Sequence, residues 1–292
     1  MKKITLLLLL IPVSAVAAET SDEDLWDFLP EPMPASEIGI SGSLDSVDGS
    51  SLQLSGSFQA PASSRISLSL GKSRSVSDFS TLDTTFWRVG WRSDPAAVAS
   101  VTLAYEGEDN DGAFDSSGVS LGLAFNSDSM TLSITPRFRN ISMDVKQQKA
   151  NRPGTIDLDA RDLTVALEWF SDSGWVIGGR HTASDYSRDL RRLATDPKIQ
   201  LLFSPETLEL SGGLEERRTS LSAFRTLAAA LVGVEWSRGL SAATDSVSTT
   251  VSVLASFDIS RQWRLDLGVG ATNADYNSET TFSGNAGVAY RW

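Results

Sequence analysis

Alternation of apolar and polar residues runs through most of this chain from Ile38 to Trp292. In the last stretch, "TFSGNAGVAYRW", every second residue from Phe282 to Trp292 is apolar or small, and most of the residues between them are small or polar. Successive side chains of an extended strand point to opposite sides, so this period of two predicts a β-strand with two different faces. Repetition of the pattern predicts a series of antiparallel strands, each with one apolar face.

The number of strands follows from chain length. Residues 38–292 at about 9 to 11 residues per spanning strand, plus connections, allow 12 to 14 strands, and even counts are preferred. We predict 14 strands, with 12 as the alternative. The segment between Asp185 and Asp245 is the ambiguous part, because it fits either two or three strands.

The first residues have the pattern of a secretory signal peptide. Lys2 and Lys3 precede an apolar run, and Ala15-Val16-Ala17 offers a cleavage site. Residues 1–18 are assigned to this signal. Residues 19–37 form an acidic, proline-rich lead-in on the periplasmic side, expected to be a linker; its Trp26 and Phe28 leave open a small plug or a partner-binding segment.

Composition excludes several classes of protein. The formal net charge is −12, which disfavours nucleic acid as a partner. The chain has no cysteine, so it has neither a disulfide scaffold nor a thiol nucleophile. No later apolar stretch is long enough for a transmembrane helix, which leaves a closed barrel as the route into lipid. Tryptophans near strand ends suit membrane interfaces better than a soluble β-sandwich, the competing interpretation.

The signal peptide and the final "VAYRW" resemble those of Gram-negative outer-membrane β-barrels of the porin-like class. The resemblance covers residues 38–292 in architecture only. It implies an all-β, transmembrane, antiparallel up-and-down barrel located in the bacterial outer membrane. It also implies that Val288, Tyr290 and Trp292 form the signal read by the barrel-assembly machinery. Short turns that alternate with longer, charged connections are typical of the same class.

If the apolar rows face lipid, the residues between them face a polar interior. Charged residues expected there are Arg65, Arg88, Arg92, Glu106, Arg137, Arg139, Asp162, Glu168, Arg180, Glu209, Glu215, Arg217, Glu235, Asp258, Arg264, Asp266 and Arg291. The pore-lining candidates are a basic wall of Arg88, Arg92, Arg137 and Arg139, opposed by Glu168 and Glu209, together with Glu106 and Arg180. Such a field would select small polar or anionic solutes for passive diffusion. The alternative is a closed barrel, filled by paired charges, that acts through its extracellular loops.

An enzymatic site would have to be built around the only histidine, His181. On a strand, Ser184 faces away from His181, and no G-x-S-x-G motif occurs, so no catalytic residue is assigned and an enzyme is the third choice. The acidic stretch with Asp109 and Asp111 lacks the first and last ligands of a calcium loop. We therefore expect a solvated loop, no metal site and no cofactor.

Two other connections are basic; the default expectation is solvated loops with no specific ligand, and the alternative is that they meet lipopolysaccharide phosphates outside the cell. The contact candidates are Lys146, Lys149, Arg152, Arg188, Arg191 and Arg192. The stretch "SRDLRRLA" is expected to form a short helix capped by Ser187. The solute and the oligomeric state stay open.

Overall fold

The computed structural model describes residues 36–76, 81–110, 114–145, 154–195, 214–227, 230–275 and 280–292. The expected signal peptide, almost all of the lead-in and some candidate residues lie outside these ranges; these candidates are Lys146, Lys149, Arg152 and Glu209.

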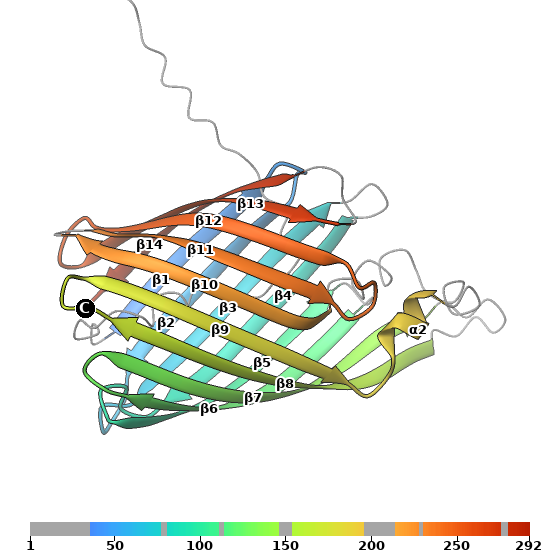
Figure 1. Ribbon diagram of the computed structural model, residues 1–292, viewed down its shortest axis with the longest axis horizontal. Coiled ribbons are helices and arrows are strands. Elements are labelled where there is room, and N and C mark those ends of the chain that lie inside the picture. Colours follow the sequence, from blue (N-terminus) through green and yellow to red (C-terminus); the bar gives the residue numbers. More distant parts are fainter. Residues whose placement is uncertain are drawn as a thin grey trace, which may run out of the picture.

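Fourteen antiparallel strands, counted within those ranges, form one closed barrel (Figure 1). They are β1 (Ser36–Asp45), β2 (Ser50–Gln59), β3 (Arg65–Val76), β4 (Thr81–Arg92), β5 (Ala99–Asn110), β6 (Phe114–Asn126), β7 (Met130–Val145), β8 (Gly154–Phe170), β9 (Trp175–Tyr186), β10 (Glu215–Leu227), β11 (Ala230–Ser241), β12 (Val247–Asp258), β13 (Trp263–Ala274) and β14 (Thr281–Arg291). Each strand pairs with its neighbours in sequence, and β1 pairs with β14. The predicted up-and-down barrel of 14 strands is confirmed.

The described part of the ambiguous segment contains β10 and β11 and the short helix α2 (Leu190–Thr195). No helix in the described ranges is long and apolar enough to cross a membrane.

The first and last described residues of the chain pair with each other and close the ring of strands. The backbone N–H of Ser36 donates to Trp292 O at 3.2 Å, and the N–H of Trp292 donates to Ser36 O at 3.1 Å. The register continues with Ile38 opposite Tyr290. Because every strand thus has two partners, no edge remains to expose unpaired backbone groups, as a bilayer requires.

The apolar rows face outward. Leu52, Leu70 and Val269 are 58%, 54% and 59% exposed, whereas the inward Ser100 and Ser120 are buried. A soluble protein would bury such a continuous apolar surface, because each exposed leucine forfeits about 1.5–3 kcal/mol of burial free energy. The outer face is therefore suited to lipid.

Aromatic side chains line the outer face at the end of the barrel that holds Ser36 and Trp292. Trp169 and Trp175 flank the β8–β9 turn, Trp263 packs on Tyr290 with ring centroids 5.0 Å apart, and Tyr290 stacks on Trp292 at 5.9 Å. Rings of this kind settle at a membrane interface, since one side of the ring is apolar and the polar edge meets water.

The connections differ from the expected alternation of short and long. The charged stretches 71–82 and 106–117 are predicted from the sequence as long loops, but both mostly continue as strands: β3 reaches Val76 before β4 begins at Thr81, and β5 reaches Asn110 before β6 begins at Phe114. These charged residues extend the hairpins beyond the apolar rows. The longest connection, between β9 and β10, contains α2 and lies at the end of the barrel away from Ser36 and Trp292 (Figure 1).

Candidate functional site

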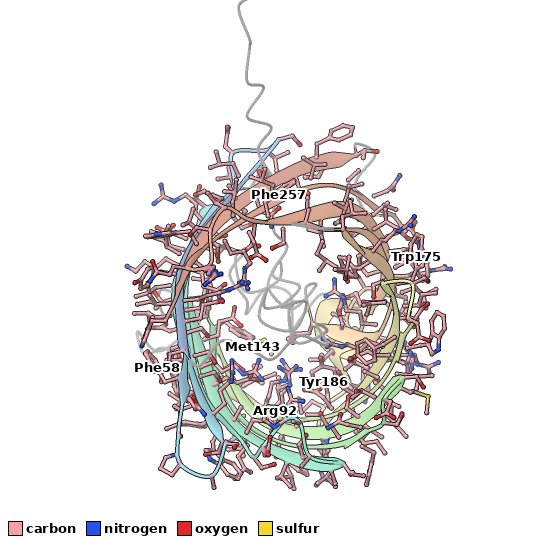
Figure 2. The ribbon with its side chains drawn as sticks, turned by 90° about the vertical axis from the view of Figure 1, so that its left-hand side faces the viewer. Phe58, Arg92, Met143, Trp175, Tyr186 and Phe257 are labelled. Carbon is pink, nitrogen blue, oxygen red and sulfur yellow. The ribbon has the colours of Figure 1, made fainter. Side chains whose placement is uncertain are left out.

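Strand alternation sends one set of charged side chains into the barrel. On β4, Arg88 lies between the outward Trp87 and Val89, and Arg92 follows the outward Trp91. Figure 2, which looks along the barrel, shows Arg92 inside the ring of strands. By the same alternation, Arg137 and Arg139 of β7 and Arg180 of β9 point inward.

Four strands contribute to an inner charge network of Arg88, Glu106, Arg137, Arg139 and Asp162. Arg137 Nη1 donates to Glu106 Oε1 at 2.7 Å, and its Nε donates to Asp162 Oδ2 at 2.7 Å. Arg139 donates from Nε and Nη2 to the two oxygens of Asp162, at 2.9 and 3.2 Å. Arg88 Nε lies 3.9 Å from Glu106 Oε2. Three arginines are therefore held by two carboxylates.

A glycine on β6 makes the network possible. Glu106 on β5 and Arg137 on β7 are separated by β6, where Gly118 is the register partner of both Glu106 and Arg139. A Cβ at Gly118 would lie 2.8 Å from Arg139 Cγ. With no side chain there, the carboxylate and the guanidinium groups meet over the strand between them.

The counter-charges differ from those expected. Glu168 lies on β8, directly beside the arginine-bearing β7, so the expectation that it faces the arginines from the opposite wall is wrong. Glu209 lies outside the described residues. Alternation already placed Asp162 inward, but its central position depends on the β7–β8 register, which pairs it with Arg137.

A second network of ion pairs, the seam network, joins the strands at which the barrel closes. Glu37 of β1 accepts from Arg264 Nη2 of β13 at 2.8 Å and from Arg291 Nε of β14 at 3.0 Å. Arg264 also pairs with Asp266, and Arg291 with Asp258. Sequence reasoning missed Glu37 because it falls in the expected lead-in, whereas β1 begins at Ser36.

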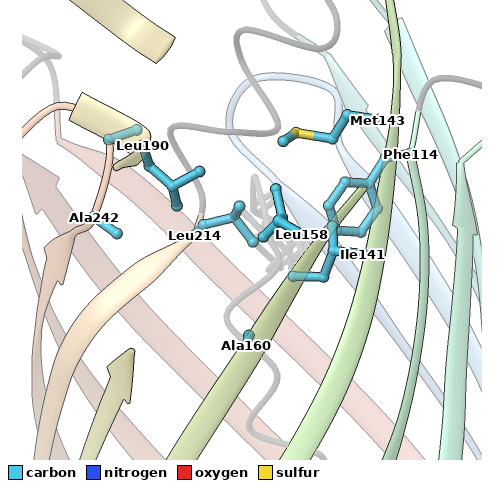
Figure 3. Packing of buried hydrophobic residues seen from close by; sticks show 9 residues of the cluster. Phe114, Ile141, Met143, Leu158, Ala160, Leu190, Leu214 and Ala242 are labelled. Atoms are coloured by element: carbon cyan, nitrogen blue, oxygen red, sulfur yellow. The ribbon is translucent and has the colours of Figure 1, made fainter. Parts of the chain in front are cut away.

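The expectation of an entirely polar interior is wrong in two places. The first is the mouth cluster, at the end of the barrel away from the termini; Figure 3 shows Leu190 of α2 near Leu214, with Phe114, Ile141 and Met143 on the other side. Its buried members are Phe114, Ile141, Met143, Leu158, Ala160, Leu190, Leu214, Ala242 and Ala243. The second is a smaller cluster of Val176, Phe224, Leu231 and Leu254 with Phe170. Inward apolar residues of a barrel can be covered by a helix such as α2 and by segments that flank the strands. The residue pattern of a single strand does not reveal such contacts.

Ion pairs also hold the segment that carries α2. Arg191 Nη2 lies 2.6 Å from Glu216 Oε2 and 2.7 Å from Asp245 Oδ1, so this lipopolysaccharide candidate contacts the chain's own carboxylates. The helix begins later than expected, and Asp189, not Ser187, accepts from its backbone at Arg192 N, at 3.3 Å. Arg188 and Arg192 are exposed.

One inward assignment is reversed by a β-bulge. The β10–β11 register shifts between Glu215 and Arg217, so Arg217 shares the outward face with Leu221. Its side chain is 64% exposed. A bulge inserts one residue and reverses the alternation beyond it.

The lone histidine also faces outward. His181 Nδ1 is 2.9 Å from Thr219 Oγ1 on the next strand, while Ser184 takes the inward face. The two side chains therefore do not meet, and the His181–Ser184 pair considered from the sequence does not form.

No protein-family model and no curated protein sequence matches this chain. Among solved structures, the CymD monoaromatic hydrocarbon channel superposes with a TM-score of 0.60 and 11% sequence identity, over 89% of each chain. The NanC porin gives a TM-score of 0.48 at 9% identity, over 87% of this chain and 100% of that one. An anion-selective porin from Comamonas acidovorans gives 0.47 at 8% identity, over 88% and 98%.

At these identities the likeness concerns the fold. Together with the closed barrel and its outward apolar face, it places the chain by architecture among closed β-barrels that resemble outer-membrane porins and channels, without a specific family.

Proposed function

We propose that this barrel is an outer-membrane channel for passive diffusion of small polar or anionic solutes. The observation that carries the proposal is the inner charge network, in which the inward Arg88, Arg137 and Arg139 gather around Glu106 and Asp162. Arg92 and Arg65 add inward positive charge on neighbouring strands, where they are register partners. Arginines concentrated on one side of a confined interior attract anions and orient dipolar solutes.

Barrel size supports the same proposal. About 8 strands enclose only packed side chains or one small ligand, and the diameter grows with strand number. A barrel of 14 strands exceeds what inward side chains usually fill.

The competing function is a closed barrel that acts through its surface. The observation in its favour is the mouth cluster, whose members Ile141 and Met143 are 1% and 0% exposed. We infer that this cluster narrows the channel without closing it. The reason is that α2 belongs to the connection between β9 and β10 and is not part of the barrel wall.

Single-channel current separates the two functions. The chain without residues 1–18 is refolded and inserted into a planar bilayer under a salt gradient. We expect steady conductance with anion preference, and a weaker preference in Arg88→Ser/Arg92→Ser. Arg161→Ser is the matched control, because Arg161 is exposed on the outer face of β8. A folded barrel that passes no current would refute the channel.

A further inference from the structure

A row of polar residues interrupts the outer wall on β9–β11. Thr219 of β10 is the register partner of both His181 on β9 and Arg238 on β11, so these three side chains share one level and one face. Arg217 is the next outward residue on β10, on the side away from the chain termini. We call these four residues the outer-wall patch.

The patch lies near the far end of the apolar rows of β9 and β10, and on β11 only Leu240, the register partner of Arg217, continues the outward row beyond it. Toward Ser36 and Trp292, the next outward residues are Gly179, Leu221 and Trp236, followed on β9 and β11 by Ile177 and Val234. Ile177, Leu221 and Val234 are 47%, 54% and 50% exposed. His181, Arg217 and Arg238 are exposed as well, although they are polar. This arrangement places two guanidinium groups at the boundary between hydrocarbon and the layer of lipid head groups.

Little within the described chain neutralises the patch. Arg217 Nη2 contacts Glu216 Oε1 at 3.3 Å, and no described residue forms an ion pair with Arg238. Thr219 Oγ1 is bonded to His181 Nδ1. Diagonal neighbours on adjacent strands are about 7–8 Å apart, so Arg217 and Arg238 are spaced to bind one anionic group between them.

We propose that the outer-wall patch binds a phosphate group of a phosphorylated glycolipid in the outer leaflet. Arginine forks match phosphate oxygens and are weakly hydrated, so they bind well at a partly dehydrated interface. The acyl chains of the same lipid would lie along the apolar side chains on the periplasmic side of the patch. This site differs from the loop arginines considered above, one of which, Arg191, contacts Glu216 and Asp245.

The test uses native mass spectrometry of the refolded chain in detergent. The probes are bis-phosphorylated lipid A and the same lipid without its phosphates. We expect adducts with the phosphorylated lipid only, and a loss of affinity of about tenfold or more in Arg217→Gln/Arg238→Gln, because charge-assisted hydrogen bonds to phosphate are removed. Arg217→Lys/Arg238→Lys should retain part of the binding.

Arg225→Gln is the matched control. Arg225 lies on the same strand and face near the opposite end, where its guanidinium sits 5.4 Å from the Trp175 ring centroid. Equal binding of both lipids, or an equal loss in Arg225→Gln, would overturn the proposal. So would oligomers of the chain that dissociate in the double variant, because the patch would then be a contact between copies. Circular dichroism verifies that each variant is folded.

Discussion

At the scale of single residues, Asp162 is the most constrained charge among the described pore-lining positions. Its side chain is 1% exposed, and it accepts hydrogen bonds from both Arg137 and Arg139. A buried carboxylate is tolerated only when its oxygens are satisfied and its charge is matched. The two arginines do both, and the carboxylate in turn fixes where their positive charge lies.

Replacement of Asp162 by Asn should therefore destabilise the barrel. Loss of one member of a buried ion pair costs roughly 3–5 kcal/mol, but Arg137 and Arg139 are 24% and 13% exposed, and water can partly solvate them. We expect a loss of about 2–3 kcal/mol in the free energy of unfolding, measured by urea titration of the barrel in lipid vesicles. Asp185→Asn, at an exposed position on β9, is the control. An equal loss of stability in that variant would contradict a stabilising role for the buried ion pairs of Asp162.

At the scale of elements, α2 is attached by two kinds of contact of unequal strength. The ion pairs of Arg191 are exposed, with 49% of its side chain accessible, and such pairs contribute about 0–1 kcal/mol. Leu190 is 3% exposed in the mouth cluster, and truncation of a buried leucine costs about 2–5 kcal/mol. The apolar contact should therefore dominate the position of the helix.

If the mouth cluster constricts the channel, Leu190→Ala should raise the single-channel conductance more than Arg191→Ala. The physical reason is that the weaker apolar contact lets α2 leave the mouth more often. Arg188→Ala, at an exposed position just before the helix, serves as the control. Identical conductance in all three variants would mean that α2 does not limit the current.

At the scale of the whole molecule, the fold depends on closure between β1 and β14, which come from the two ends of the described chain. The seam network reinforces this pairing, because Glu37 of β1 contacts arginines on β13 and β14. The outward Val288, Tyr290 and Trp292 lie on or directly after the closing strand. Their proposed recognition by the assembly machinery therefore concerns the strand that completes the barrel.

Glu37→Gln, which removes a carboxylate of the seam network, should lower the free energy of unfolding less than Asp162→Asn, which removes a carboxylate of the inner charge network. Arg264 keeps Asp266 as a partner and Arg291 keeps Asp258, so neither cation is left without a carboxylate. We expect a loss of about 1–2 kcal/mol, seen as unfolding at lower temperature on a heat-modifiability gel. Asp128→Asn, in an exposed turn, should leave that temperature unchanged.

Sequence alone was enough to predict the barrel and which rows face lipid, and it favoured 14 strands over the alternative of 12. Alternation is a local property: once a strand is extended, the direction of Leu52 or Arg88 follows from its position alone. The same local rule failed for Arg217, because a bulge in the pairing reverses the alternation.

Which inward residues meet depends on how the strands pair and pack in three dimensions. Glu106 reaches Arg137 because the registers of three strands align over Gly118, and Ile141 is buried because Leu190 and its neighbours pack into the mouth. Both depend on contacts between segments far apart in the chain. A pattern of period two carries no information about such contacts, because shifting the register by two residues leaves every face unchanged.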